Sequence, residues 1–285
     1  MDSIKKYFSL VKFAHTIFAM PFALIGFFLG VRTGEGQHYG LLFLLIILCM
    51  VFARSAAMAF NRWIDEKFDR LNPRTAQREI PAGKITKSHA LIFVMVNCIL
   101  FILATLFINR LCFYLSPIAL IVILGYSYTK RFTALCHLFL GLGLSLAPIG
   151  AFIAVTGHFS LLPVLFSIVV LCWVSGFDII YALQDDTFDQ ENKLHSVPVW
   201  LGRKRGLFFS SVLHVISALL VILAGIYGSF HWLYWLGAVL FIGMLIYQHW
   251  LVKPDDLRKV NIAFMTANGI ASCIFSAFVI GAIFL

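Results

Sequence analysis

Acidic side chains at helical spacing mark two short segments of the chain. Residues four apart lie on one face of a helix. The first segment contributes the series Asn61, Asp65 and Asp69. The second segment, about 120 residues later, repeats that spacing with Tyr181, Asp185 and Asp189, and Asp178 stands one turn earlier. If both segments are helical, each presents one acidic ridge.

Two acidic ridges that face each other repel unless a cation lies between them. Mg²⁺ suits such a place, because it takes carboxylate oxygens together with substrate phosphates. Ordinary solvated helix ends are the alternative, but eight of the 13 acidic residues fall in these two segments. The concentration of acids favours a Mg²⁺ site.

Basic residues lie close to both acidic segments in the sequence. A diphosphate held by a metal also needs Arg or Lys donors. The candidates are Arg74, Arg78, Lys130, Arg131, Lys193 and His195. Each one alone is better explained as a determinant of membrane topology than as a ligand, but as a group they indicate an anion bridged by metal.

The elements that carry these residues are membrane helices. The chain of 285 residues is 61% hydrophobic and only 12% charged, which excludes a soluble domain with a polar surface. A membrane helix needs roughly 20 apolar residues. Nine stretches meet this need: 13–31, 39–60, 88–108, 112–129, 134–156, 161–182, 207–228, 232–252 and 261–284. We expect an all-α polytopic membrane protein with nine transmembrane helices in a single domain, 1–285.

The positive charges predict the orientation of these helices. Basic loops are retained in the cytoplasm, and 20 of the 22 Lys and Arg residues fall on the side of the N-terminus and the two polar segments. The N-terminus and both segments are therefore expected in the cytoplasm, and the C-terminus outside. The net charge of +9 follows from this bias and from contact with anionic lipid, so nucleic acid is not an expected partner.

Other functional classes fit the sequence less well. The six cysteines all lie in apolar stretches without a C-x-x-C pair, which is typical of packing residues. An ion or solute transporter is the main alternative, but its acids usually lie near the bilayer midplane, whereas these stand at helix ends. A phosphotransferase acting on nucleotide-linked alcohols is disfavoured because a D-G-x-x-A-R pattern is absent.

Four sequence motifs resemble the UbiA superfamily of intramembrane aromatic prenyltransferases. They are N-R-W-I-D-E-K-F-D at 61–69, R-T-A-Q-R-E-I-P-A-G at 74–83, Y-S-Y-T-K-R-F-T at 126–133 and D-I-I-Y-A-L-Q-D-D-T-F-D at 178–189. The resemblance covers the whole chain. It implies nine helices around a central cavity in the cell's inner membrane. It also implies Mg²⁺-dependent transfer from a polyprenyl diphosphate to an aromatic acid, as in ubiquinone or menaquinone biosynthesis.

The resemblance also implies roles for individual residues. The metal-binding groups would be Asn61, Asp65, Asp69, Asp185 and Asp189, with Asp65 and Asp185 central to catalysis. Arg78 and Lys130 would bind the diphosphate. Asp178 and Tyr181 would be further catalytic residues that line the aromatic pocket, where either Asp178 or the departing diphosphate would accept the ring proton. Arg54 is expected to bind a carboxylate of the acceptor, although an arginine at this depth can also extend to the membrane interface.

Three departures from the common family pattern leave the acceptor open. Arg62 replaces the first Asp of N-D-x-x-D, F-A-H-T-I-F-A-M-P at 13–21 replaces R-L-D-K-P, and His195 stands where a Lys is usual. Together they resemble a subgroup linked to menaquinone made through futalosine. The acceptor is therefore expected to be 4-hydroxybenzoate or a dihydroxynaphthoate.

Overall fold

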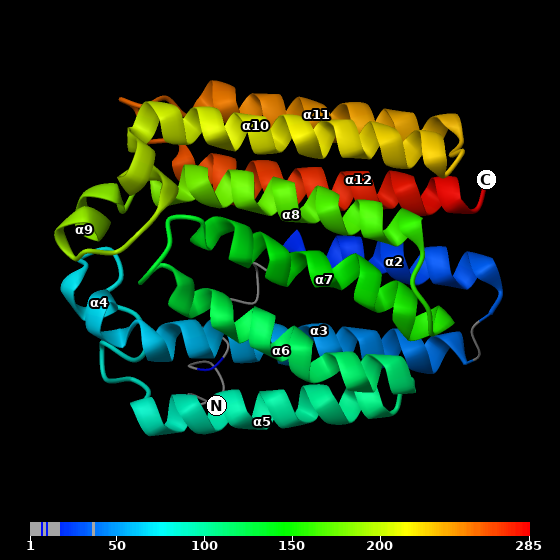
Figure 1. Ribbon diagram of the computed structural model, residues 1–285, viewed down its shortest axis with the longest axis horizontal. Helices are drawn as coiled ribbons and strands as arrows, with labels where there is room; N and C mark the ends of the chain where they lie inside the picture. The colour runs from blue at the N-terminus through cyan, green and yellow to red at the C-terminus, as the bar shows by residue number, and fades with distance from the viewer. Residues whose placement is uncertain (1–6, 8–9, 11–17, 36–37) are drawn as a thin grey trace.

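The computed structural model describes residues 7, 10, 18–35 and 38–285 of the chain. Its long helices run side by side along one axis (Figure 1). In chain order the elements are α2 (Met20–Thr33), α3 (Tyr39–Ile64), α4 (Glu66–Leu71), α5 (Lys87–Leu106), α6 (Arg110–Thr129), α7 (Cys136–Thr156), α8 (Leu161–Ala182), α9 (Asp186–Glu191), α10 (Val197–Tyr227), α11 (Trp232–Leu251), the π-helix η2 (Ile262–Ala267) and α12 (Asn268–Ile283).

The helical membrane fold expected from the sequence is confirmed. Within the described residues, eight helical segments are long and apolar enough to cross a membrane, with η2 and α12 counted as one segment. The remaining apolar helix, α2, has 14 residues. The predicted first stretch starts earlier, at residue 13, and its part up to residue 17 lies outside the described residues.

Polar caps fix the starts of several helices. The side chains of Thr86, Asn109 and Ser196 accept hydrogen bonds from backbone N–H groups in the first turns of α5, α6 and α10. Because of the Ser196 cap, α10 begins ten residues before the stretch predicted at 207–228. Gly202 kinks this helix with φ 77° and ψ 164°, a conformation that suits glycine.

The two acidic segments lie at the same end of the bundle. Asp65 stands between α3 and α4, and Asp185 stands directly before α9. Each residue therefore lies where a long helix ends and a short helix begins. The short helices α4 and α9 lie near each other at the left end in Figure 1. The side of the membrane on which this end lies stays a prediction.

Aromatic side chains fill the core between α2, α8, α11 and α12. Trp173 on α8 is fully buried and its ring lies 5.3 Å from Phe22 and 5.7 Å from Phe241. On the other side of α8, α7 packs closely, because a Cβ at Gly141 would lie 2.5 Å from the Leu171 carbonyl oxygen. On its other side, α7 packs against α6.

Candidate active site

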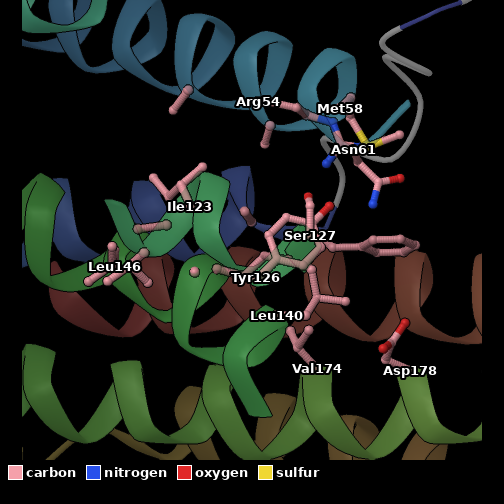
Figure 2. Close-up of a pocket in the computed structure, with 18 of the residues that line it drawn as sticks. Arg54, Met58, Asn61, Ile123, Tyr126, Ser127, Leu140, Leu146, Val174 and Asp178 are labelled. Carbon is pink, nitrogen blue, oxygen red and sulfur yellow. The ribbon is translucent and has the colours of Figure 1, made fainter. Parts of the chain in front are cut away.

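A cavity of about 620 Å³ lies among α3, α6, α7 and α8. Its polar end is at the acidic helix ends, and its lining continues to residues such as Ile108, Cys112 and Ile153 at the opposite ends of the helices. Figure 2 shows Arg54 and Asn61 on α3, across the cavity from Val174 and Asp178 on α8. The acidic side chains of the two ridges therefore lie at one end of a long cavity.

Asp65 is the more deeply buried acid of the first ridge and has two cationic partners. Its residue is 2% exposed, and its carboxylate accepts from Lys130 Nζ at 2.7 Å and Arg131 NH2 at 2.9 Å. The Asn61 amide donates to the same carboxylate at 3.4 Å. Arg131 also donates to the carbonyl oxygens of Ile64 and Ser127. Arg131 thereby ties the end of α3 to the end of α6.

Asp69, one turn further on, is paired with Arg78. The Arg78 NH1 group lies 2.8 and 3.0 Å from the two carboxylate oxygens, and Asp69 is 5% exposed. The Thr75 hydroxyl donates to the Asp69 carbonyl oxygen at 3.1 Å. The segment after α4 therefore folds back over the acidic ridge, which brings Arg78 to the cavity.

Asp185, in the second ridge, is held by residues of the first polar segment. Arg74 forms an ion pair with it, and its Nε lies 2.9 Å from Asp185 Oδ1, while Asn72 donates to the same oxygen at 3.2 Å. Arg74 also donates to the Tyr181 hydroxyl at 2.9 Å. The Tyr181 ring stacks on Phe264 of η2 with centroids 4.1 Å apart. These contacts join the two halves of the chain.

The acids of α9 have contrasting surroundings. Burial raises the pKa of Asp189 to about 6, against the opposing effect of Lys130. The hydrogen bond from Arg203 holds the pKa of Asp186 below its ordinary value, with Arg203 Nε 2.5 Å from Asp186 Oδ2. Asp189 lines the cavity, whereas Asp186 joins α9 to α10.

The buried positive charge of Arg62, which departs from the common motif, is neutralised by Glu79, a residue that the sequence did not predict for the site. Arg62 is 2% exposed and its NH1 lies 3.2 Å from Glu79 Oε2. Glu79 is itself 7% exposed. The acid that the common motif places here is therefore replaced by a buried ion pair. Glu79 stands next to the selected Arg78, but no helical spacing marked it.

Asp178 and His137 form a second contact that the sequence did not reveal. His137 Nδ1 lies 2.7 Å from Asp178 Oδ2, and both residues line the cavity. Asp178 comes from α8 and His137 from the first turn of α7. The two residues are 41 positions apart, so only the packing of α7 on α8 brings them together.

The structure separates the predicted basic residues into two groups. Arg54, Arg74, Arg78 and Lys130 line the cavity. His195 also lines it, and its backbone N–H donates to the Lys130 carbonyl oxygen at 2.7 Å. Lys193 is exposed, and neither it nor Arg131 is among the lining residues.

The predicted metal ligands share the cavity without forming a compact cluster. In the described part of the chain, no group of three or more His, Cys, Asp or Glu residues stands close enough together to hold a metal ion. Instead, the cations that pair with the acids of the ridges are side chains of this protein: Arg74, Arg78, Lys130 and Arg131. These ion pairs offset the negative charge of the ridges.

The known proteins that are similar to this chain in sequence or fold point to one family. Residues 19–270 match the UbiA prenyltransferase family. The 4-hydroxybenzoate octaprenyltransferase of Tolumonas auensis is 30% identical over 234 residues, 82% of each chain, and that of Aliivibrio salmonicida is 31% identical over 236 residues, also 82% of each chain.

Solved structures show the same fold. A UbiA homologue from Aeropyrum pernix K1 superimposes with a TM-score of 0.80 and 28% identity, covering 95% of this chain and 96% of that one. A UbiA homologue from Archaeoglobus fulgidus bound to GPP and Mg²⁺ gives a TM-score of 0.76 at 20% identity, covering 98% and 100%. The chain belongs to the UbiA prenyltransferase family.

Proposed function

We propose that this membrane prenyltransferase transfers a polyprenyl group from polyprenyl diphosphate to an aromatic acid of quinone biosynthesis, 4-hydroxybenzoate or a dihydroxynaphthoate. One observation carries the proposal. Two acidic ridges and their basic partners converge on one end of a cavity whose other end is apolar. A substrate with a charged head and a long hydrocarbon chain matches both ends.

The polar end suits a diphosphate. Lys130 and Arg78 line the cavity and now bind Asp65 and Asp69, so their charged groups are already held at the acidic ridge. A guanidinium or ammonium group can exchange a carboxylate for a phosphate oxygen, because both are charge-assisted acceptors. Arg78 and Lys130 would therefore bind the leaving diphosphate and stabilise the charge that it gains.

The donor set fits Mg²⁺. The oxygens of Asn61, Asp65, Asp69, Asp185 and Asp189 belong to residues that all line the cavity. These are hard oxygen donors of the kind that Mg²⁺ takes. When bound there with the diphosphate, the metal would supply Lewis-acid stabilisation of the leaving group. GPP and Mg²⁺ are the ligands of the related Archaeoglobus fulgidus protein, which supports this choice.

The apolar end suits the prenyl chain. Small residues of α7, among them Gly143, Ala147 and Gly150, line the cavity at helical spacing. A Cβ at Gly150 would meet no atom within 4 Å, and one at Gly143 only the Ile123 Cα at 3.9 Å. Space that side chains would otherwise fill is thus left open to a hydrocarbon chain, away from water.

Arg54 would bind the carboxylate of the acceptor. It lies on α3 two turns before Asn61, and both point into the space that Asp178 faces from α8 (Figure 2). A guanidinium binds a carboxylate through two parallel hydrogen bonds. An acceptor bound this way would lie between the polar end of the cavity and its apolar part.

A product assay tests the proposal. Purified protein would be given a long polyprenyl diphosphate, Mg²⁺ and one of three acceptors: 4-hydroxybenzoate, 1,4-dihydroxy-2-naphthoate or 1,4-dihydroxy-6-naphthoate. We expect a prenylated product with one of them, and its loss when EDTA removes the metal. Turnover that persists in EDTA would contradict the metal assignment, and the absence of product with all three would contradict the acceptor class.

The proposed orientation can be tested separately. The polar end of the cavity would face the cytoplasm from the inner membrane, as the basic residues around it favour. A reporter fused after Leu285 is then expected to be active outside the cytoplasm. Cytoplasmic activity of that fusion would overturn the proposed topology.

A further inference from the structure

His137 lies where three helices meet. It is 3% exposed and belongs to the first turn of α7. Its Nδ1 lies 2.7 Å from Asp178 Oδ2 on α8, and its Nε2 accepts from the N–H of Val197, the first residue of α10, at 3.3 Å. The Ser175 hydroxyl donates to its carbonyl oxygen. The imidazole is thus held by partners on both ring nitrogens.

These two partners determine the tautomer of His137. A backbone N–H can only donate, so Nε2 must be the acceptor and carries no hydrogen. The neutral ring then has its hydrogen on Nδ1, where the partner is a carboxylate oxygen of Asp178. His137 is therefore a fixed donor to Asp178, which leaves the other oxygen, Oδ1, as the remaining acceptor of that carboxylate.

Asp178 differs from the acids of the two ridges in its partner. Asp65, Asp69 and Asp185 each contact an Arg or Lys side chain. In the described part of the chain, the ion-pair partner of Asp178 is a histidine. Asp178 also lies about two turns deeper than Asp185, facing the space across from Arg54 (Figure 2). A carboxylate in that place is within the part of the cavity assigned to the acceptor ring.

We infer that His137 is a positioning residue that holds the Asp178 carboxylate in the orientation in which it takes the proton that the aromatic ring loses. The inference rests on the proposed function. In the transfer, the allylic C–O bond breaks and its electron pair leaves with the diphosphate, while a ring carbon bonds to C1 of the prenyl chain. The ring C–H electron pair then restores aromaticity, and the proton moves to Asp178 Oδ1, from which it returns to water.

Two isosteric substitutions separate this role from a purely structural one. The amide nitrogen of asparagine occupies roughly the position of Nδ1, so His137→Asn can still donate to Asp178. The amide oxygen of glutamine reaches roughly the position of Nε2, so His137→Gln can still accept from Val197 but leaves Asp178 without its donor. The two variants therefore remove opposite halves of the contact.

The experiment measures kcat and KM of both variants with the acceptor that the wild-type protein uses, together with Tm in detergent. We expect His137→Gln to lower kcat roughly tenfold to a hundredfold with little change in either KM, and His137→Asn to recover most of that loss. Wild-type kcat in His137→Gln, or the reverse order of the two variants, would overturn the inference, because the second result would mean that capping α10 is what matters.

A further variant keeps the inference testable if both histidine variants unfold. Asp178→Asn can still accept from His137 but cannot take a proton, so it is expected to fold and to lose turnover. A folded Asp178→Asn protein with wild-type kcat would overturn the inference. Failure of the wild-type protein itself to form product would instead count against the proposed function.

Discussion

The two ends of the cavity are built by opposite means. At the polar end, acids and bases are packed against each other: Asp65 alone contacts Lys130, Arg131 and Asn61. At the apolar end, glycine and other small residues leave the space open, as at Gly150, where a Cβ would meet nothing within 4 Å. One end is organised by charge pairing and the other by the lack of bulk.

Under the proposed function, this difference would let the protein bind a charged substrate without being unstable in its absence. Burying an unpaired charge costs several kcal/mol. Here Asp65, Asp69 and Asp185 are already paired with Arg or Lys side chains, so a bound diphosphate would take over cations that these acids now hold. The apolar end needs no such exchange, because a hydrocarbon chain replaces only apolar contacts.

The largest expected effect is at the polar end. Asp65→Asn and Asp185→Asn should each abolish turnover, because each removes a negative charge needed for the metal–diphosphate complex. Their stabilities should differ. Asp65→Asn leaves Lys130 and Arg131 beside a buried neutral group, at a cost of about 3 kcal/mol, whereas the Asp185 pair with Arg74 is more exposed and is worth at most about 1 kcal/mol.

Both quantities can be measured on detergent-solubilised protein, as product formed per unit time and as Tm. Asp186→Asn is a matched control. Like Asp185, Asp186 forms an ion pair with an arginine, here Arg203 on α10, but it does not line the cavity. This variant should keep most of the turnover. Wild-type rates in either Asp65→Asn or Asp185→Asn would contradict the proposal that both acidic ridges form the metal–diphosphate site.

The two ends also differ in how well the sequence predicts them. The acidic ridges were found because Asp65 and Asp69, like Asp185 and Asp189, follow helical spacing, and the structure brings these ridges to one cavity. The Asp178–His137 and Arg62–Glu79 contacts were not found, because they depend on how separate segments pack. The start of α10 was missed because the charges at 203–205 interrupt its apolar pattern.

The apolar end could not be predicted for a similar reason. Gly141 and Gly150 lie on one helix and look alike in the sequence, but Gly141 allows α7 to approach α8 while Gly150 opens the cavity. Only the rotation of α7 about its axis decides between the two roles. Hydropathy gives the length of a membrane helix but does not fix this rotation.

A second prediction separates the two basic residues that lie between the ends. Loss of a charge-assisted contact costs about 1.5–3 kcal/mol, so Arg54→Ala should lower kcat/KM for a carboxylated acceptor roughly tenfold to a hundredfold, with little change in KM for the prenyl diphosphate. Arg78→Ala should instead raise KM for the prenyl diphosphate. If Arg54→Ala weakens only diphosphate binding, Arg54 belongs to the polar end and not to the acceptor site.

The smallest expected effect, and the most selective one, is at the apolar end. Gly150→Leu would project a side chain into the cavity, because the glycine lines it and no atom lies within 4 Å of the added Cβ. When a long prenyl chain occupies the cavity, the added side chain would overfill it at a cost of about 1–3 kcal/mol, so kcat/KM should fall roughly tenfold for a long polyprenyl diphosphate and stay within about twofold for GPP. Gly243→Leu on α11 is the matched control: that glycine is also open to added bulk, but it is exposed and is not among the lining residues. An equal loss for both chain lengths in Gly150→Leu, or the same selectivity in Gly243→Leu, would mean that the prenyl chain does not run along α7 and leaves the polar end by another route.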